Sequence, residues 1–189
     1  MKLVDRHFLL LVIAIFGFVL GVYVAPSFTS LSTVGSESGI KYWSEVCVRK
    51  NGELIQCSHN VFTNQGKNLV RDYISGRVNS TAPAIVEHIA VGNGTAPAAG
   101  DTILSGEIRE CGLSRSVGSY RTNATDGIWF LEKVFTVSTC GGTIRANTTG
   151  LFNTSSATIS NYTFASNSFT NADLQNNDQL NITWTIAVT

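Results

Sequence analysis

The sequence predicts an all-β protein: a jelly-roll-like β-sandwich with one short helix, preceded by an N-terminal apolar helix and an extended arm. Short segments of alternating apolar and polar residues recur between positions 42 and 189, separated by Gly, Asn and Asp. The last segment, QLNITWTIAVT, alternates strictly. Its apolar face carries Ile182, Trp184, Ile186 and Val188. Charged residues are only 14% of the chain, while Ser, Thr, Asn and Gly are common, as in exported β-proteins.

Residues 1–25 are interpreted as a secretory signal peptide or a membrane anchor. Lys2 and Arg6 precede an uncharged apolar run from Phe8 to Ala25. A positive flank followed by an apolar run and small residues is typical of a secretory signal. The run also approaches the ~20 residues of a membrane-spanning helix. Both interpretations place the remaining chain outside the cell or at its surface, with membrane contact only through residues 1–25.

Residues 26–41, PSFTSLSTVGSESGIK, form the predicted arm. The segment is rich in Ser and lacks helical periodicity, which favours an extended conformation. We treat it as a candidate donor strand, meaning a strand that completes the sheet of another copy. Its apolar contacts would be Phe28, Leu31, Val34 and Ile40.

The first half of the predicted sandwich contains a hairpin and the short helix. Residues 42–48 and 54–61 form the hairpin around Asn51-Gly52. Asn64 caps the helix QGKNLVRDYISG, and Gly76 ends it. The apolar stripe of this helix is Leu69, Val70, Tyr73 and Ile74.

The remaining strands are predicted from alternation and turn residues. They span residues 84–91, 103–121, 128–139, 143–152, 157–164 and the terminal segment that ends at Thr189. The large side chains expected in the core are Trp129, Phe130, Phe135, Phe152, Phe164 and Trp184.

Four cysteines allow three disulfide pairings, and the predicted turns select one. Cys47 and Cys57 are equidistant from Gly52, and Cys111 and Cys140 are equidistant from the turn at Asp126. Residues equidistant from a hairpin turn face each other at a distance that a disulfide spans. A two-residue Asn-Gly turn would shift the first pair by one residue, so that hairpin requires an odd loop or a bulge. The sequence contains no C-x-x-C spacing, so it gives no support for a zinc site.

Seven Asn-x-Ser/Thr acceptor sites for N-linked sugar support export. They are Asn79, Asn93, Asn123, Asn147, Asn153, Asn161 and Asn181.

Catalytic and cofactor motifs are absent from the sequence. Gly112-Leu113-Ser114-Arg115-Ser116 lacks the second glycine of a nucleophile elbow, and a formal net charge of zero gives no basis for nucleic-acid binding. We therefore expect neither an enzyme nor a cofactor. Calcium is the remaining metal candidate, because aspartates occur in turn-like sequence. They are Asp101, Asp126, Asp173 and Asp178.

The predicted strand edges carry few of the Lys and Pro residues that usually protect them. Pairing such an edge with the arm of another copy, by strand addition, would satisfy it. Insertion that runs head to tail does not close on itself and builds a filament.

In layout, with a leader, a Ser-rich segment, about 150 β-rich residues and dense acceptor sites, the sequence resembles the archaeal donor-strand filament subunits of bundling pili and threads. The resemblance implies a jelly-roll-like domain whose groove receives the N-terminal strand of the next subunit. The protein's partner would then be itself, together with neighbouring filaments or cell surfaces. A local likeness to viral tail and virion β-proteins rests on HNVFTNQGKNLVRDYISG, EIRECGLSRSVGSY and GLFNTSS…NDQLNITWTI. The local likeness gives a virion protein as one alternative. If residues 1–25 stay in place as an anchor, the other alternative is a membrane-anchored adhesin or carbohydrate-binding module.

Overall fold

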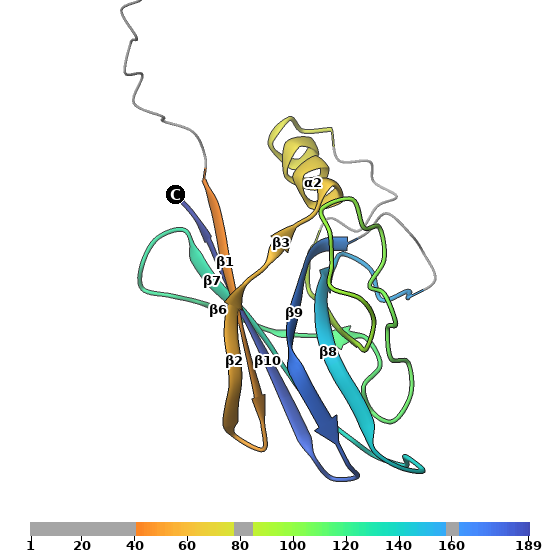
Figure 1. Ribbon diagram of the computed structural model, residues 1–189. Helices are drawn as coiled ribbons and strands as arrows, with labels where there is room; N and C mark the ends of the chain where they lie inside the picture. Colours follow the sequence, from red (N-terminus) through yellow and green to blue (C-terminus); the bar gives the residue numbers. More distant parts are fainter. Residues whose placement is uncertain (1–40, 78–84, 158–162) are drawn as a thin grey trace, which may run out of the picture. The chain divides into compact units, whose positions relative to one another are not determined.

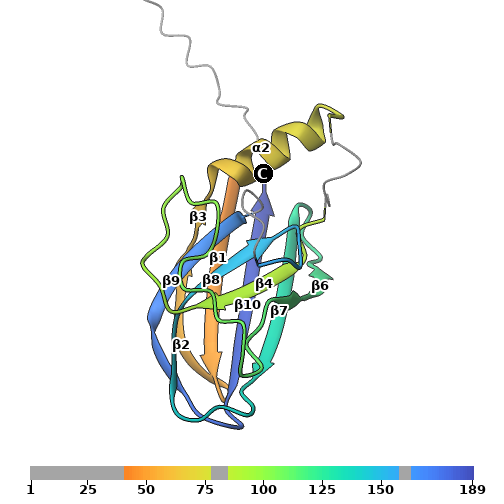
Figure 2. The ribbon, with the colours of Figure 1, turned by 90° about the vertical axis from the view of Figure 1, so that its right-hand side faces the viewer.

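The computed structural model describes residues 41–77, 85–157 and 163–189, which fold into two five-stranded antiparallel sheets and one helix (Figures 1 and 2). The prediction of an all-β sandwich with one short helix is confirmed. The apolar N-terminal helix and the arm with Phe28, Leu31, Val34 and Ile40 lie outside the described residues.

Neighbouring strands in each sheet often come from distant parts of the chain. From edge to edge, sheet A contains β2 (Glu53–His59), β1 (Tyr42–Lys50), β10 (Gln179–Val188), β7 (Ile128–Thr136) and β6 (Ser119–Thr122). In the same way, sheet B contains β3 (Val61–Phe62), β9 (Thr163–Leu174), β8 (Ile144–Phe152), β4 (His88–Gly92) and β5 (Ser116–Val117).

The first hairpin combines a tight turn with a bulge. Asn51 and Gly52 both have positive φ, at 50° and 88°, as a two-residue primed turn requires. Beyond the turn the register shifts between Val48 and Arg49. That shift sets Cys47 opposite Cys57, with the Cα atoms 4.1 Å apart, and the two are disulfide-bonded. The bulge that the sequence requires is therefore present.

Helix α2 (Asn64–Ile74) is capped by Thr63 and not by the predicted Asn64, which is its first residue. Thr63 Oγ1 accepts a hydrogen bond from Gly66 N at 2.9 Å and donates to the carbonyl of Phe164 at 3.0 Å. Gly66 packs so closely against β9 that a Cβ there would lie 2.1 Å from the Phe164 carbonyl oxygen. The start of the helix is therefore fixed to sheet B.

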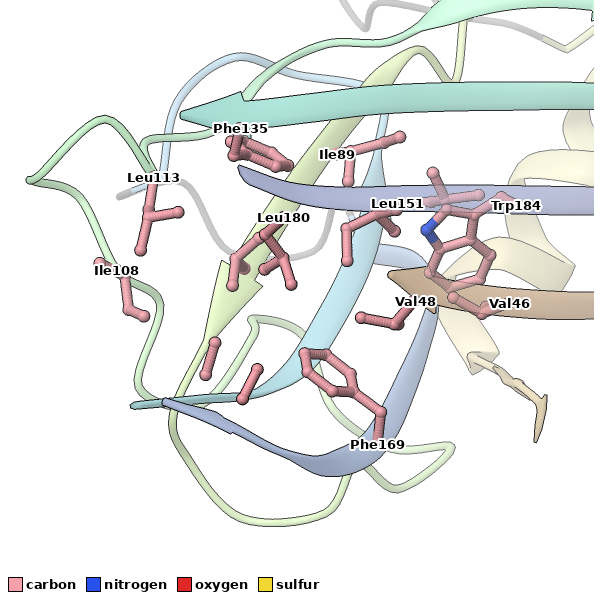
Figure 3. Packing of buried hydrophobic residues seen from close by; sticks show 14 of the residues in the cluster. Val46, Val48, Ile89, Ile108, Leu113, Phe135, Leu151, Phe169, Leu180 and Trp184 are labelled. Carbon is pink, nitrogen blue, oxygen red and sulfur yellow. The ribbon is translucent and has the colours of Figure 1, made fainter. Parts of the chain in front are cut away.

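The main hydrophobic core lies between the sheets (Figure 3). Trp184 is fully buried, and Ile182 and Ile186 lie beside it on the same face of β10. Each such side chain contributes ~1.5–3 kcal/mol through burial. Val188, which the alternation places in this row, is 37% exposed at the end of the strand. The predicted core residue Phe130 is also only half-buried: it lies on the opposite face of β7 from Leu131, below the guanidinium of Arg121 at 5.3 Å.

Two predicted strands differ from the structure. Residues 103–121 do not form one strand: most of the segment is a loop, and its end divides into β5 and β6 on either side of Gly118. A Cβ at Gly118 would lie 2.8 Å from Leu131 Cγ, so a glycine is needed where the chain passes between the sheets. Residues 158–162 of the predicted strand 157–164 lie outside the described residues, and its last two residues belong to β9, which continues to Leu174.

The two sheets are joined along the β2 side by polar side chains. Asn167 Nδ2, on β9, donates to the carbonyls of Ser58 at 3.2 Å and His59 at 2.9 Å. Gln56 Oε1 accepts from Thr170 N at 2.9 Å. The strands β2 and β9 thus satisfy part of each other's backbone, so this side of the sandwich is better protected than the sequence indicates.

Candidate functional site

Strand β8 has a strand on both sides for only part of its length. It pairs with β9 from Ile144 onward, but with β4 only from Thr148, because β4 ends at Gly92. Among the described residues, no strand pairs with positions 144–146 on the β4 side. The backbone groups that point to this side are available to an added strand.

The facing wall is the segment 106–110, which follows the end of β4. Glu107 forms an antiparallel bridge with Gly92, and Ile108 N donates to the Val91 carbonyl at 2.9 Å. The chain then turns away toward β7, where Cys111 is disulfide-bonded to Cys140. An opening of about 560 Å³ remains between this wall and the start of β8; we call it the β8 gap. Its lining residues are Asn93, residues 106–110 and residues 143–145.

A buried ion pair fixes the wall. Arg115 Nη2 lies 2.6 Å from Glu107 Oε2, and each side chain is only 3% exposed. Arg115 also donates to the carbonyls of Thr154 and Ser156, at 3.2 and 2.8 Å. Its guanidinium carbon stands 3.5 Å above the centre of the Phe152 ring. One side chain therefore ties the wall to the end of β8. In the sequence, Arg115 stands out only as part of an incomplete nucleophile motif, because its partners are distant in the chain.

The mouth of the β8 gap carries balanced charge. Arg109 donates to the Ala157 carbonyl at 2.7 Å, and Arg145 pairs with Asp173 at 2.9 Å. The hydrogen bond from Arg145 lowers the pKa of Asp173. With Glu107 and Glu110 also lining the gap, neither sign dominates. An occupant with little charge suits this site better than a strongly acidic or basic one.

The β8 gap and the start of β1 lie at opposite ends of the sandwich. Tyr42 pairs with Val188 at one end of β1, and Lys50 pairs with Leu180 at the other. Because the β9–β10 turn precedes Leu180 and β8 begins opposite Leu174, the gap lies at the Lys50 end. Figure 1 shows the start of β1 at the top and these turns at the bottom. A nine-residue strand separates the two ends by ~25–30 Å.

The disulfides predicted from the turns are both present. Cys111 and Cys140 have Cα atoms 5.3 Å apart, although Cys111 lies in a loop and not in a strand. Two disulfides indicate an oxidising, extracellular environment. Glu45 lies close to Cys47 and Cys57, the one group of metal-ligand residues found in the described part of the chain. Both of these sulfurs are in a disulfide and are not thiolate ligands.

The sugar-acceptor asparagines differ in exposure. Asn93 and Asn123 are exposed, whereas Asn147 and Asn181 are half-buried. The amide of Asn181 donates to Glu132 Oε1 at 2.7 Å on the outer face of sheet A. Asn153 is 4% exposed, which leaves no space for a sugar on it in this fold. Asn79 and Asn161 lie outside the described residues.

Three of the four calcium candidates interact with protein groups. Asp101 accepts from Ala98 N at 2.7 Å, and Asp173 pairs with Arg145. Asp178 accepts from Asn51 Nδ2 at 2.8 Å and from Gln175 N at 2.8 Å. The fourth, Asp126, is exposed in the β6–β7 turn.

In the three described stretches, no helix is long and apolar enough to cross a membrane. Comparison of the chain with protein-family models, curated proteins and solved structures gave no match.

Proposed function

We propose that this protein is a structural subunit of an extracellular filament, in which residues 26–41 of one copy enter the β8 gap of the next. The observation that carries the proposal is the position of the gap: it interrupts sheet B at the end opposite the start of β1. An arm that leaves one end and binds at the other end of a second copy leaves the gap of the first copy and the arm of the second free, so the contact can repeat head to tail.

The chemistry of the gap supports a strand of the arm's composition. The gap offers unpaired β8 backbone at positions 144–146 and lining charges of both signs. Residues 26–40 contain a single charged residue, Glu37. Main-chain hydrogen bonds would supply affinity, and Phe28, Leu31, Val34 and Ile40 would supply the side-chain contacts.

Several further features support an assembling, exported protein. The disulfides suit secretion through the leader at residues 1–25, and the exposed acceptor Asn123, which does not line the β8 gap, suits a glycosylated surface. The nested pairing of β1 with β10 and of β3 with β9 favours a jelly-roll-like sandwich. The subunit acts as a building material and not as a catalyst.

Cysteine trapping tests the arrangement directly. Cysteines placed singly at Phe28, Leu31 or Val34 are combined with Thr143→Cys in the gap, and the exported full-length chain is oxidised. The proposal expects a ladder of covalent multimers on a non-reducing gel for at least one pair. Thr122→Cys is the matched control, because it lies on β6, an exposed strand at the edge of sheet A. Ladders with Thr122→Cys but not Thr143→Cys would place the arm elsewhere and contradict the proposal.

Deletion of residues 27–40 tests the same point without added cysteines. Lys41 is kept because it exchanges backbone hydrogen bonds with Thr189, at 2.7 and 3.0 Å. Filaments should disappear from electron micrographs while the two disulfides still form. Normal filaments from the shortened chain would refute the proposal.

A further inference from the structure

The β1–β2 turn contains Asn followed by Gly, the pair of residues that loses ammonia most readily in proteins. Asn51 and Gly52 are both exposed, and no atom of the described residues lies within 4 Å of the place where a Cβ on Gly52 would stand. The Gly52 nitrogen can attack Asn51 Cγ and displace ammonia, which closes a succinimide ring. Water then opens the ring to aspartate or isoaspartate. Because glycine has no side chain, little opposes the ring closure sterically.

The folded chain holds the Asn51 side chain at both of its polar atoms. Asn51 Nδ2 donates to Asp178 Oδ1 at 2.8 Å, and Asn51 Oδ1 accepts from Gln179 N at 2.8 Å. The main-chain nitrogen of Asn51 also donates to the Gln179 carbonyl at 2.9 Å. These three hydrogen bonds, which we call the Asn51 latch, join the β1–β2 turn to the β9–β10 turn. Figures 1 and 2 show both turns at the lower end of the sandwich.

The carboxylate of Asp178 is held with one oxygen toward the Asn51 amide. Its other oxygen, Oδ2, lies 3.0 Å from Lys50 Nζ and accepts from Gln175 N at 2.8 Å. Deamidation replaces Asn51 Nδ2, a donor, with an oxygen of an ionised carboxylate. Two negatively charged oxygens would then face each other where a hydrogen bond now stands, while Lys50 lies at the far oxygen of Asp178. The latch therefore accepts an amide at position 51 and opposes a carboxylate there.

We infer that Asn51 is a deamidation site that the fold suppresses, and that its conversion to aspartate or isoaspartate opens the Asn51 latch. Ring closure requires the Asn51 amide to give up its hydrogen bonds to Asp178 and Gln179 and to approach the Gly52 nitrogen. The reaction therefore proceeds from the population of molecules in which the turn is locally open. The inference concerns the single subunit and does not depend on the proposed filament.

Peptide mapping by mass spectrometry tests the suppression. The exported full-length chain, with both disulfides intact, is incubated at mildly alkaline pH, and conversion at position 51 is followed with time. Conversion should be much slower in the folded chain than in the same chain in urea. Folded Asp178→Ala should convert roughly tenfold faster than wild type, because the latch loses hydrogen bonds. Asp173→Ala is the matched control: this nearby carboxylate pairs with Arg145 and not with Asn51, so the rate should stay at the wild-type value.

Melting curves test the consequence of the modification. Asn51→Asp reproduces the aspartate product and should melt below wild type at neutral pH. Combining it with Asp178→Asn exchanges donor and acceptor across the latch and should recover part of the loss, whereas Asp173→Asn should recover none. Four results would overturn the inference: equal conversion in the folded chain and in urea, equal conversion in wild type and Asp178→Ala, an Asn51→Asp variant that melts with wild type, or an exchange that recovers nothing.

Discussion

Breaking the Arg115–Glu107 pair should destabilise the protein more than breaking an exposed ion pair. Arg115→Met keeps the length of the side chain but removes its charge and its donors. Glu107 is then left buried without a partner, and the carbonyls of Thr154 and Ser156 lose their hydrogen bonds from Arg115. Loss of one partner of a buried pair costs ~3–5 kcal/mol. We expect the free energy of unfolding to fall by that amount.

The assay is urea unfolding followed by tryptophan fluorescence, with both disulfides intact. With an m value of ~1–3 kcal/mol/M, the midpoint should fall by roughly 1–5 M. Arg145→Met is the matched control, because the Arg145–Asp173 pair is exposed to solvent and its loss should change the midpoint far less. Replacing both buried partners, with Arg115→Met and Glu107→Leu, should recover part of the loss. Equal effects of Arg115→Met and Arg145→Met would refute the reasoning.

Three further predictions concern the core, the helix and the turns. Trp184→Ala should cost ~3–5 kcal/mol in urea unfolding, and Trp184→Phe much less, since Trp184 is fully buried and its Nε1 has no hydrogen-bond partner in the described residues. Gly66→Ala should lower stability by ~1–3 kcal/mol despite its better helix propensity, because the new Cβ would overlap the Phe164 carbonyl; a rise in the melting temperature would contradict this. The hydrogen bond from Asn51, followed by those from Gln175 N and Lys50, lowers the pKa of Asp178 from 3.8 to about 2. A lowered acid pKa stabilises the fold above the unfolded value and loses that effect as pH falls toward 2. The melting-temperature difference between wild type and Asp178→Asn should therefore shrink between pH 5 and pH 2.

Local features of the fold are predictable where chemistry and spacing agree. Asn51-Gly52 determines the first turn, and the alternation from Ile182 to Ile186 determines which face of β10 is buried. The second disulfide is predicted correctly although its strand is not. Ser119 pairs with Glu132 across β6 and β7, and the same register extended along the chain sets Cys111 opposite Cys140. The disulfide prediction therefore does not depend on a continuous strand.

The errors arise where distant segments decide the local structure. The predicted strand ends at Phe164, whereas β9 continues to Leu174. Ser166 and Asn167 within this continuation are buried, and Asn167 bonds the backbone of β2. The loop before β5 is held by Arg115, whose acceptors lie about 40 residues away in sequence. Alternation cannot reveal either contact. The β8 gap is unpredictable for the same reason, since it depends on where β4 ends relative to β8.

The position of the β8 gap makes the assembly hypothesis more specific than the sequence does. A single acceptor at the start of β1 would favour reciprocal exchange between two copies, because donor and acceptor would then lie at one end. The β8 gap lies at the other end, ~25–30 Å away, so an arm bound there would leave a free gap and a free arm at the two ends of the pair, as the proposed head-to-tail filament requires.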